Sequence, residues 1–165
     1  MVLALRPGLH AAVPEAEVKS VLLFHLCQFV SWPPSAEARP FCIGVLGPDE
    51  FGDALDQAVH GEQVHGGPIT IRRSFRAADL ADCQIVFICS GAREPLAHIR
   101  DTLKPMPTLL VGESEDFLRE GGMVNFALMP NHKFRLEVQL DRLRDCGLKM
   151  SAQLLRVCVV KGGQS

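Results

Sequence analysis

The sequence predicts a single α/β domain in three layers, with a mostly parallel central sheet, an antiparallel C-terminal hairpin and helices on both faces. Over the first two thirds of the chain, short apolar segments rich in β-branched residues alternate with segments of helical periodicity. That order is typical of parallel sheets covered by helices. In the last third, two strand-like segments flank a polar turn, which indicates a hairpin. A length of 165 residues is enough for one self-sufficient core.

We assign residues 15–160 to this domain. Residues 1–14 precede the first helical pattern, and we interpret them as a flexible segment or the remnant of a secretory signal. Arg6, Pro7 and Gly8 interrupt the apolar stretch, so the segment does not read as a complete signal peptide. A trimmed signal, a start assigned too far downstream and a cytosolic protein all stay open at this point.

The first elements are a helix and a buried strand. Apolar residues recur at helical spacing over 15–31, and Trp32-Pro33-Pro34 ends this helix. The apolar run 41–47 ends in Gly-Pro, as a buried strand does. A second helix is predicted over 49–58, with Asp49 as its N-cap.

The middle of the chain continues the alternation. Residues 60–68 are rich in glycine and polar residues and are predicted to form a loop. The strongest strand prediction is 84–89, because this segment is apolar and β-branched and lies between Asp82 and Ser90-Gly91. The same criteria predict strands at 69–73 and 108–111, a helical turn at 77–81, and helices at 94–103 and 115–119.

The C-terminal third changes character. The arms of the predicted hairpin are 123–128 and 134–140, and every other residue of the second arm is apolar, which gives one buried and one exposed face. We predict a helix over 141–146 that ends at Gly147, and a final helix from Ser151 through Val159.

Charge and hydropathy exclude two classes of protein. The net charge is −2, and the one basic cluster, Arg72-Arg73 with Arg76, is diluted by Asp79 and Asp82. A broad face for nucleic acid is therefore not predicted. The most apolar segment, 18–30, is shorter than the roughly 20 residues of a membrane span.

No pattern for catalysis, a metal or a cofactor is found. The segment Gly44–Gly52 follows a strand, but it is not a G-x-G-x-x-G loop, and Asp49 and Glu50 would repel a pyrophosphate. His60 and His65 share a loop with one acidic residue and lack a third metal ligand. No nucleophile, base and orienting group come together. We therefore expect a protein that is not an enzyme and holds no cofactor or metal.

Among the six cysteines, Cys42 and Cys83 stand out. No C-x-x-C motif is present, which argues against a zinc ribbon or a thioredoxin-type centre. Cys42 begins the first strand and Cys83 directly precedes the strongest one, so neighbouring parallel strands would bring the two together. A disulfide and two unrelated buried thiols are equally compatible with this placement. Three other cysteines lie inside apolar runs and are interpreted as small buried hydrophobes: Cys27, Cys89 and Cys158.

The segment Gly147-Leu-Lys149-Met-Ser151 leads into the last predicted helix. Backbone N–H groups, a capping hydroxyl and a lysine favour a small anion or a carboxylate. A plain N-cap beside a solvated lysine is the alternative.

A series of short motifs between residues 18 and 159 resembles the YfiR-like family in order and spacing. The helix ending in Phe24-His-Leu-Cys-Gln-Phe-Val-Ser-Trp-Pro33 resembles the opening of these proteins, and Gln139 and Leu143-Arg144 depart from the family pattern. The remaining motifs are Phe41-Cys-Ile-Gly-Val-Leu-Gly47, Phe51-Gly52, Asp82-Cys-Gln-Ile-Val-Phe87, Thr108-Leu-Leu-Val111, Phe117, Gly121-Gly-Met-Val-Asn-Phe126, Phe134-Arg-Leu-Glu-Val138 and Gly147-Leu-Lys-Met-Ser151 with Leu154-Leu155.

The resemblance implies a non-enzymatic periplasmic regulator. Such proteins bind and inhibit the sensor region of an inner-membrane diguanylate cyclase and so lower cyclic-di-GMP signalling. Capture by an outer-membrane lipoprotein releases the cyclase, and the regulators resemble homodimers. The alternative function is a small-molecule binding module that senses an aromatic or anionic ligand.

The resemblance also implies site residues. Cys42 and Cys83 match family cysteines, which favours a disulfide between them. Trp32, Lys149 and Ser151 are implied as a ligand-responsive site.

Overall fold

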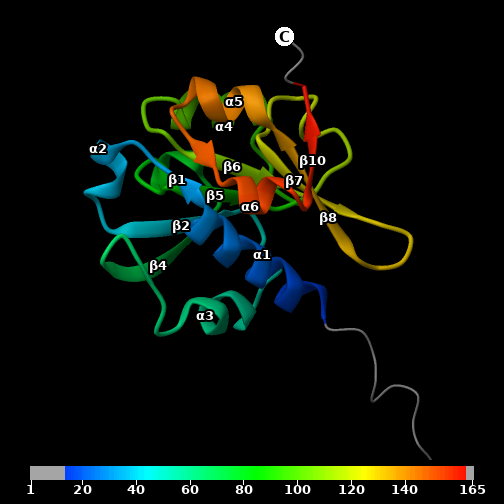
Figure 1. Cartoon of the computed structure of the whole chain (residues 1–165), viewed down its shortest axis with the longest axis horizontal. Coiled ribbons are helices and arrows are strands. Elements are labelled where there is room, and N and C mark those ends of the chain that lie inside the picture. The colour runs from blue at the N-terminus through cyan, green and yellow to red at the C-terminus, as the bar shows by residue number, and fades with distance from the viewer. Residues whose placement is uncertain (1–13, 163–165) are drawn as a thin grey trace, which may run out of the picture.

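The computed structural model describes residues 14–162, so the predicted N-terminal segment lies outside the described residues except for Pro14. Figure 1 shows a central sheet with helices on both sides. The helices are α1 (Glu15–Phe29), α2 (Pro34–Glu37), α3 (Ala54–Val59), the 3-10 helix η2 (Ala77–Leu80), α4 (Leu96–Leu103), α5 (Leu140–Asp145) and α6 (Ala152–Leu155). The strands are β1 (Val30–Ser31), β2 (Phe41–Leu46), β3 (Gln63–Val64), β4 (Gly67–Ser74), β5 (Ile85–Ile88), β6 (Leu109–Gly112), β7 (Val124–Leu128), β8 (Phe134–Gln139), β9 (Lys149–Met150) and β10 (Cys158–Lys161).

The main sheet has eight strands in the order β10-β8-β7-β6-β5-β2-β4-β3. Strands β4, β2, β5, β6 and β7 run parallel, whereas β8 is antiparallel to β7. This arrangement confirms the predicted mostly parallel sheet with an antiparallel hairpin. Strands β1 and β9 form a separate antiparallel pair, which was not predicted.

The chain order explains why helices cover both faces. From β2 the chain moves outward to β4 through α3, and from β5 it moves in the opposite direction to β6 through α4. Since such crossovers are right-handed, opposite directions place the two helices on opposite faces. Accordingly, α1 and α3 lie on one side of the sheet and α4 and α5 on the other (Figure 1).

The core fills both sides of the central strands. All residues of β2 and β6 are buried, as predicted from their continuous apolar runs. Phe87 of β5 packs against Phe51 and Phe126 with ring centroids 5.0 and 5.8 Å apart, on the face that α1 covers. A sheet buried on both faces is what the apolar, non-alternating strands require.

The helix predicted over 49–58 begins only at Ala54. Asp49 does not cap it, because its Oδ1 accepts a hydrogen bond from the backbone N–H of Phe51 and its Oδ2 accepts one from Arg73 Nε. Gly52 then takes a φ of +54°, which a right-handed helix excludes. The prediction of an N-cap at Asp49 was therefore wrong.

The helix predicted over 115–119 is a series of turns instead. The ring of Phe117 lies against two glycines, and a Cβ added to Gly112 or Gly122 would lie 2.5 or 2.1 Å from it. This close packing between backbone segments holds the turn in a compact, non-helical form. The loop predicted over 60–68 contains the short strand β3, and the helix predicted from residue 94 begins at Leu96.

The final helix predicted through Val159 was also wrong. Helix α6 ends at Leu155, and the chain then forms β10, which pairs in parallel with β8. The run Val157-Cys-Val-Val160 contains β-branched residues that favour a strand when a neighbouring strand is free to pair. Between residues 14 and 162, no helix is long and apolar enough to cross a membrane.

Candidate functional site

Cys42 and Cys83 meet at the beginning of two central strands. Strands β2 and β5 are parallel neighbours, and the Sγ atoms of the two cysteines lie 3.0 Å apart in a buried position. Gln84 fixes this arrangement, because its Oε1 accepts the Cys42 N–H and its backbone N–H donates to the Cys42 carbonyl. Both residues are thiols in the structure, and the disulfide stays a prediction.

The two thiols differ in acidity. The hydrogen bond from Cys83 lowers the pKa of Cys42 to about 7, and Thr70 and Arg72 act in the same direction. The pKa of Cys83 is raised, first by its hydrogen bond to Cys42 and then by burial. Because the thiolate is the nucleophile in disulfide chemistry, the lowered pKa favours Cys42 over Cys83 as the attacking thiol of the pair.

Trp32 belongs to the core. Only 4% of its surface is exposed, and its Nε1 donates to the backbone carbonyl of Gln84 at 3.2 Å. Its ring packs edge-on against Phe41 and His65, with centroids 5.2 and 6.2 Å away. The indole N–H is already used inside the protein, so Trp32 offers no free donor to a ligand.

Lys149 and Ser151 lie beside Trp32 in the chain fold but serve different roles. Lys149 is exposed and pairs through its backbone with Ser31 of β1. The Ser151 hydroxyl accepts the N–H of Leu154 and caps α6, while its own N–H donates to Phe29. This geometry agrees with the plain N-cap alternative for Ser151, and the ligand role of the three residues stays a prediction.

The basic cluster of the sequence is neutralised by carboxylates. Arg72 forms an ion pair with Asp82, and Arg73 pairs with Asp49 at 2.7 Å and Asp56 at 2.5 Å. These contacts use the arginine donors that a phosphate backbone would need. In the part of the chain that the structure describes, neither histidine of the 60–68 loop belongs to a group of three or more side chains that could hold a metal ion.

Sequence reasoning missed a buried charged cluster at the carboxyl ends of the parallel strands, the end of the sheet opposite to Cys42 and Cys83. Lys19 of α1 is 3% exposed, and its Nζ lies 2.8 Å from Glu113 Oε2 and 3.3 Å from Glu50 Oε2. The same ammonium group lies over the rings of Phe51 and Phe87, 5.5 and 5.9 Å from their centroids. We call Lys19, Glu50 and Glu113 the Lys19 cluster.

The position of the Lys19 cluster matters because ligands of open α/β sheets bind there. Glu50 follows β2 and Glu113 follows β6, so both lie at the carboxyl ends of parallel strands. The order of strands reverses between β2 and β5, which is where such sheets bind anionic ligands. In this protein the cation of α1 and two carboxylates of the chain itself occupy that place.

The two carboxyl groups of the Lys19 cluster differ in the direction of their pKa shifts. Burial raises the pKa of Glu113, whereas the hydrogen bond from Glu113 lowers the pKa of Glu50. The nearby Cys89 thiol has its pKa raised to about 12, first by burial, and is therefore a poor nucleophile. The signal for this cluster was present as a lysine in the middle of an apolar helix and an acid after each of two buried strands.

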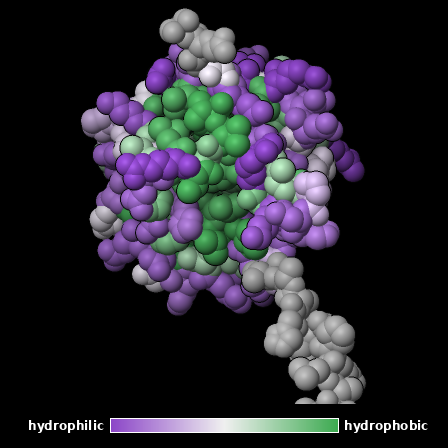
Figure 2. All heavy atoms as spheres, turned by 45° about the vertical axis from the view of Figure 1, so that its right-hand side comes forward, coloured by the Kyte–Doolittle hydropathy of each residue, from purple (hydrophilic) through white to green (hydrophobic). Residues whose placement is uncertain are grey.

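Exposed apolar residues occur on α1 and at β10. Val157 and Val160 are 70% and 44% exposed, and Val21 of α1 is 46% exposed. Figure 2 shows an apolar region on the face of the molecule that it brings forward. Strand β10 pairs only with β8 among the described strands, so its outer edge is open. We call the exposed residues Val21, Val157 and Val160 the apolar surface.

Comparisons with solved structures and curated proteins place this fold. It is similar to the crystal structure of a conserved domain protein from Vibrio cholerae O1 biovar eltor, with a TM-score of 0.61 and 10% identity. The match covers 92% of this chain and 62% of that chain, and at this identity it shows the fold alone. No curated protein gives a match.

The family comparison is more specific. The model of a family described as YfiR/HmsC-like (DUF4154) matches residues 16–159, nearly the whole described domain. This class of protein is regulatory and non-catalytic, and it acts in the periplasm on diguanylate cyclase signalling. The chain belongs to the YfiR/HmsC-like family, as the motifs of the sequence indicated.

Proposed function

We propose that this protein is a non-enzymatic periplasmic regulator that binds and inhibits the sensor region of an inner-membrane diguanylate cyclase. Membership of the YfiR/HmsC-like family supports the pathway. The single observation that carries the mode of action is the apolar surface beside the open edge of β10. Exposed apolar residues next to an unpaired strand form a docking surface for another protein chain.

The physical requirement on such an inhibitor is modest. It needs higher affinity for the inactive state of its target than for the active state, because equal affinity shifts no equilibrium. Strand β10 supplies backbone donors and acceptors for strand addition, and Val157 and Val160 supply apolar contacts. No catalytic group is needed for this function.

The experiment compares two variants that differ in position and not in chemistry. Val157→Asp places a charge on the apolar surface. The control, Phe75→Asp, places the same charge at a residue that is 71% exposed and lies in the connection between β4 and η2. We expect Val157→Asp to weaken binding to the cyclase sensor region by at least about tenfold, or ~1.4 kcal/mol. Phe75→Asp should bind like the unmodified protein.

Binding is measured by calorimetry with the purified sensor regions of the host's membrane-bound diguanylate cyclases, and cyclic-di-GMP is measured in cells that express each variant. Val157→Asp should raise cyclic-di-GMP and Phe75→Asp should not. If both variants repress equally well, the apolar surface is not the binding site. If none of the sensor regions binds the unmodified protein, the proposed function is wrong.

The homodimer and the outer-membrane lipoprotein partner implied by the family resemblance are part of the same proposal. A lipoprotein that competes with the cyclase would relieve inhibition without any chemical step. Sedimentation of the chain alone measures the dimer, and addition of the lipoprotein to the preformed cyclase complex measures the release.

A further inference from the structure

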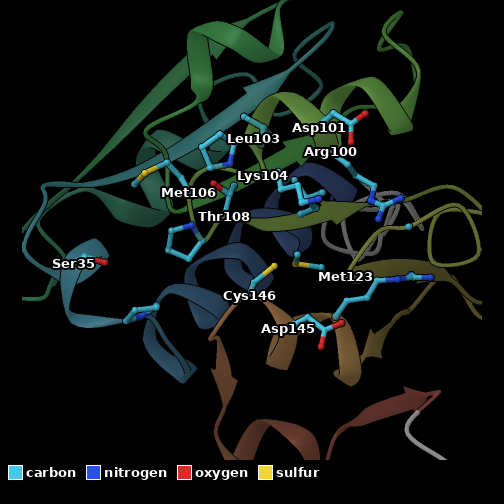
Figure 3. A pocket seen from close by; sticks show the side chains of 16 residues that line it. Ser35, Arg100, Asp101, Leu103, Lys104, Met106, Thr108, Met123, Asp145 and Cys146 are labelled. Carbon is cyan, nitrogen blue, oxygen red and sulfur yellow. The ribbon is translucent and has the colours of Figure 1, made fainter.

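A cavity of about 590 Å³ opens at the amino-terminal edge of β6 and β7, the edge opposite the Lys19 cluster. The end of α4, the loop 104–108, residues 121–123 and α5 surround it. Figure 3 shows side chains from these four segments converging on one space. Its volume falls within the range of small-molecule sites.

Two guanidinium groups stand at this cavity without a carboxylate partner. Arg142 Nη1 donates to the backbone carbonyl of Gly122 at 2.7 Å and to that of Leu118, which leaves its Nε and Nη2 donors for another group. Arg100 packs along the same turn, where a Cβ added to Gly121 would lie 2.6 Å from its Nη1. Within residues 14–162, neither arginine forms an ion pair.

The electrostatics of the two arginines favour a bound anion. The pKa of Arg142 is lowered, first by burial and then by the like charge of Arg100. Lys104 adds a third cation to the wall. Two acids, Asp101 and Asp145, also border the cavity, and within the described residues neither forms an ion pair with Arg100 or Arg142. An anion placed between the guanidiniums would relieve their repulsion and satisfy the open donors.

The rest of the wall is apolar. Leu103, Leu110 and Met123 are buried residues that line the cavity, and two prolines of the 104–108 loop close one side. A bare inorganic anion would leave this part of the space empty. The ligand that fits both halves carries one anionic group on a small apolar or aromatic body.

We propose that this cavity binds a small organic carboxylate, with the carboxylate between Arg100 and Arg142 and the apolar body against Leu103, Leu110 and Met123. The site is separate from Trp32, Lys149 and Ser151. It is also independent of the proposed cyclase regulation, so either can fail without the other.

The test uses benzoate as the probe, with benzamide as its neutral counterpart and inorganic phosphate as the bare anion. Binding is measured by calorimetry on the full chain. We expect benzoate to bind, benzamide to bind at least about tenfold more weakly, and phosphate not to compete at equal concentration. Arg100→Gln should weaken benzoate binding at least about tenfold, since it removes a guanidinium that makes no hydrogen bond within the described protein.

Matched controls separate the site from general charge effects. Arg144→Gln removes an exposed arginine from the same helix as Arg142 but outside the cavity, and Lys149→Gln removes the cation of the other predicted ligand site. Both should bind benzoate normally. Arg142→Lys keeps a donor for the turn at Leu118 and Gly122, so a loss of binding in this variant with an unchanged melting temperature reports on the ligand.

Cys146 provides a second readout because it lines the cavity. Benzoate should slow alkylation of Cys146 by N-ethylmaleimide and leave Cys158, a half-buried cysteine outside the cavity, unaffected. The proposal is overturned if benzoate does not bind at millimolar concentration, if benzamide or phosphate binds equally well, or if Arg100→Gln and Arg142→Lys bind benzoate normally. Loss of binding only in Lys149→Gln would assign the ligand to the other site.

Discussion

At the residue scale, the hydrogen bond between the two thiols at the start of β2 and β5 shifts their pKa values in opposite directions. Cys42 and Cys83 are both buried, yet the pKa of one falls and that of the other rises, because the thiolate form of Cys42 is stabilised by the thiol of Cys83. Their contact joins residues 41 positions apart. A covalent bond at this place would close that whole segment.

We predict that oxidation links Cys42 to Cys83 and stabilises the protein. The chain-entropy estimate for a loop of this length is about 3–4 kcal/mol. The measurement is urea unfolding of the oxidised and the reduced protein, with the linked peptide identified by mass spectrometry.

The matched variants are Cys42→Ala and Cys146→Ala. The first should remove the difference between oxidised and reduced protein, and the second should leave it unchanged. Free thiols at both positions after exposure to an oxidising glutathione buffer would exclude this disulfide and weaken the periplasmic assignment.

At the scale of an element, α1 is attached to the sheet by apolar contacts and by the Lys19 cluster. The buried ammonium joins a residue of the helix to acids that follow β2 and β6. Removing one partner of a buried ion pair costs much more than an exposed pair contributes, because the remaining charge stays buried. The helix position is therefore sensitive to the protonation of Glu113 and Glu50.

The pH dependence of stability follows from the two acids with opposite sign. Burial raises the pKa of Glu113 above its ordinary value of 4.5, so its contribution is present below that value and is lost as pH rises through the pKa of the folded state. We predict that the excess stability of the unmodified protein over Glu113→Gln decreases as the pH rises above 4.5, the ordinary pKa of this carboxyl. Urea unfolding at a series of pH values measures it.

Glu50 serves as the control for direction. Its pKa is lowered, first by the hydrogen bond from Glu113, so its contribution is present above its ordinary value of 4.5 and is lost as pH falls. The excess stability over Glu50→Gln should therefore grow as pH rises. If the stability difference changed with pH in the same direction for both variants, the opposite pKa shifts of Glu113 and Glu50 would be contradicted.

At the scale of the whole molecule, burial decreases from the centre of the sheet to its edges. Every residue of β2 and β6 is buried, whereas β10 has two exposed and two half-buried residues. The other edge strand, β3, has only two residues. Local opening requires little free energy where few apolar contacts must break.

We predict that amide hydrogen exchange is slowest in β2, β5 and β6 and at least about a hundredfold faster in β10, a difference of ~2.7 kcal/mol in opening free energy. The measurement is exchange followed by NMR on the monomeric fraction. Addition of a cyclase sensor region should slow exchange in β10 and leave β3 unchanged. Protection of β10 in the free monomer equal to that of β2 would contradict an open edge.

The local pattern of the sequence was sufficient for most of the fold. The continuous apolar runs 41–47, 84–89 and 108–111 predicted buried parallel strands, and alternation over 134–140 predicted a strand with one buried face. The family follows from motifs distributed over residues 18–159. The proximity of Cys42 and Cys83 could be expected because Cys42 lies at the start of one strand and Cys83 precedes the neighbouring parallel strand.

Only the tertiary structure decided the rest. The run at 158–161 forms β10 and not a helix because β8 offers it a free edge, and that edge is not encoded near residue 158. Lys19 and Glu113 are 94 residues apart, and Arg100 and Arg142 meet only where α4 and α5 close on one turn. The periodicity of a segment determines which of its faces is buried, whereas contacts between polar side chains depend on which loops meet at the edges of the sheet. The sequence by itself therefore determined the class of fold and the family, and the three-dimensional packing decided where the charged cluster, the cavity and the open edge lie.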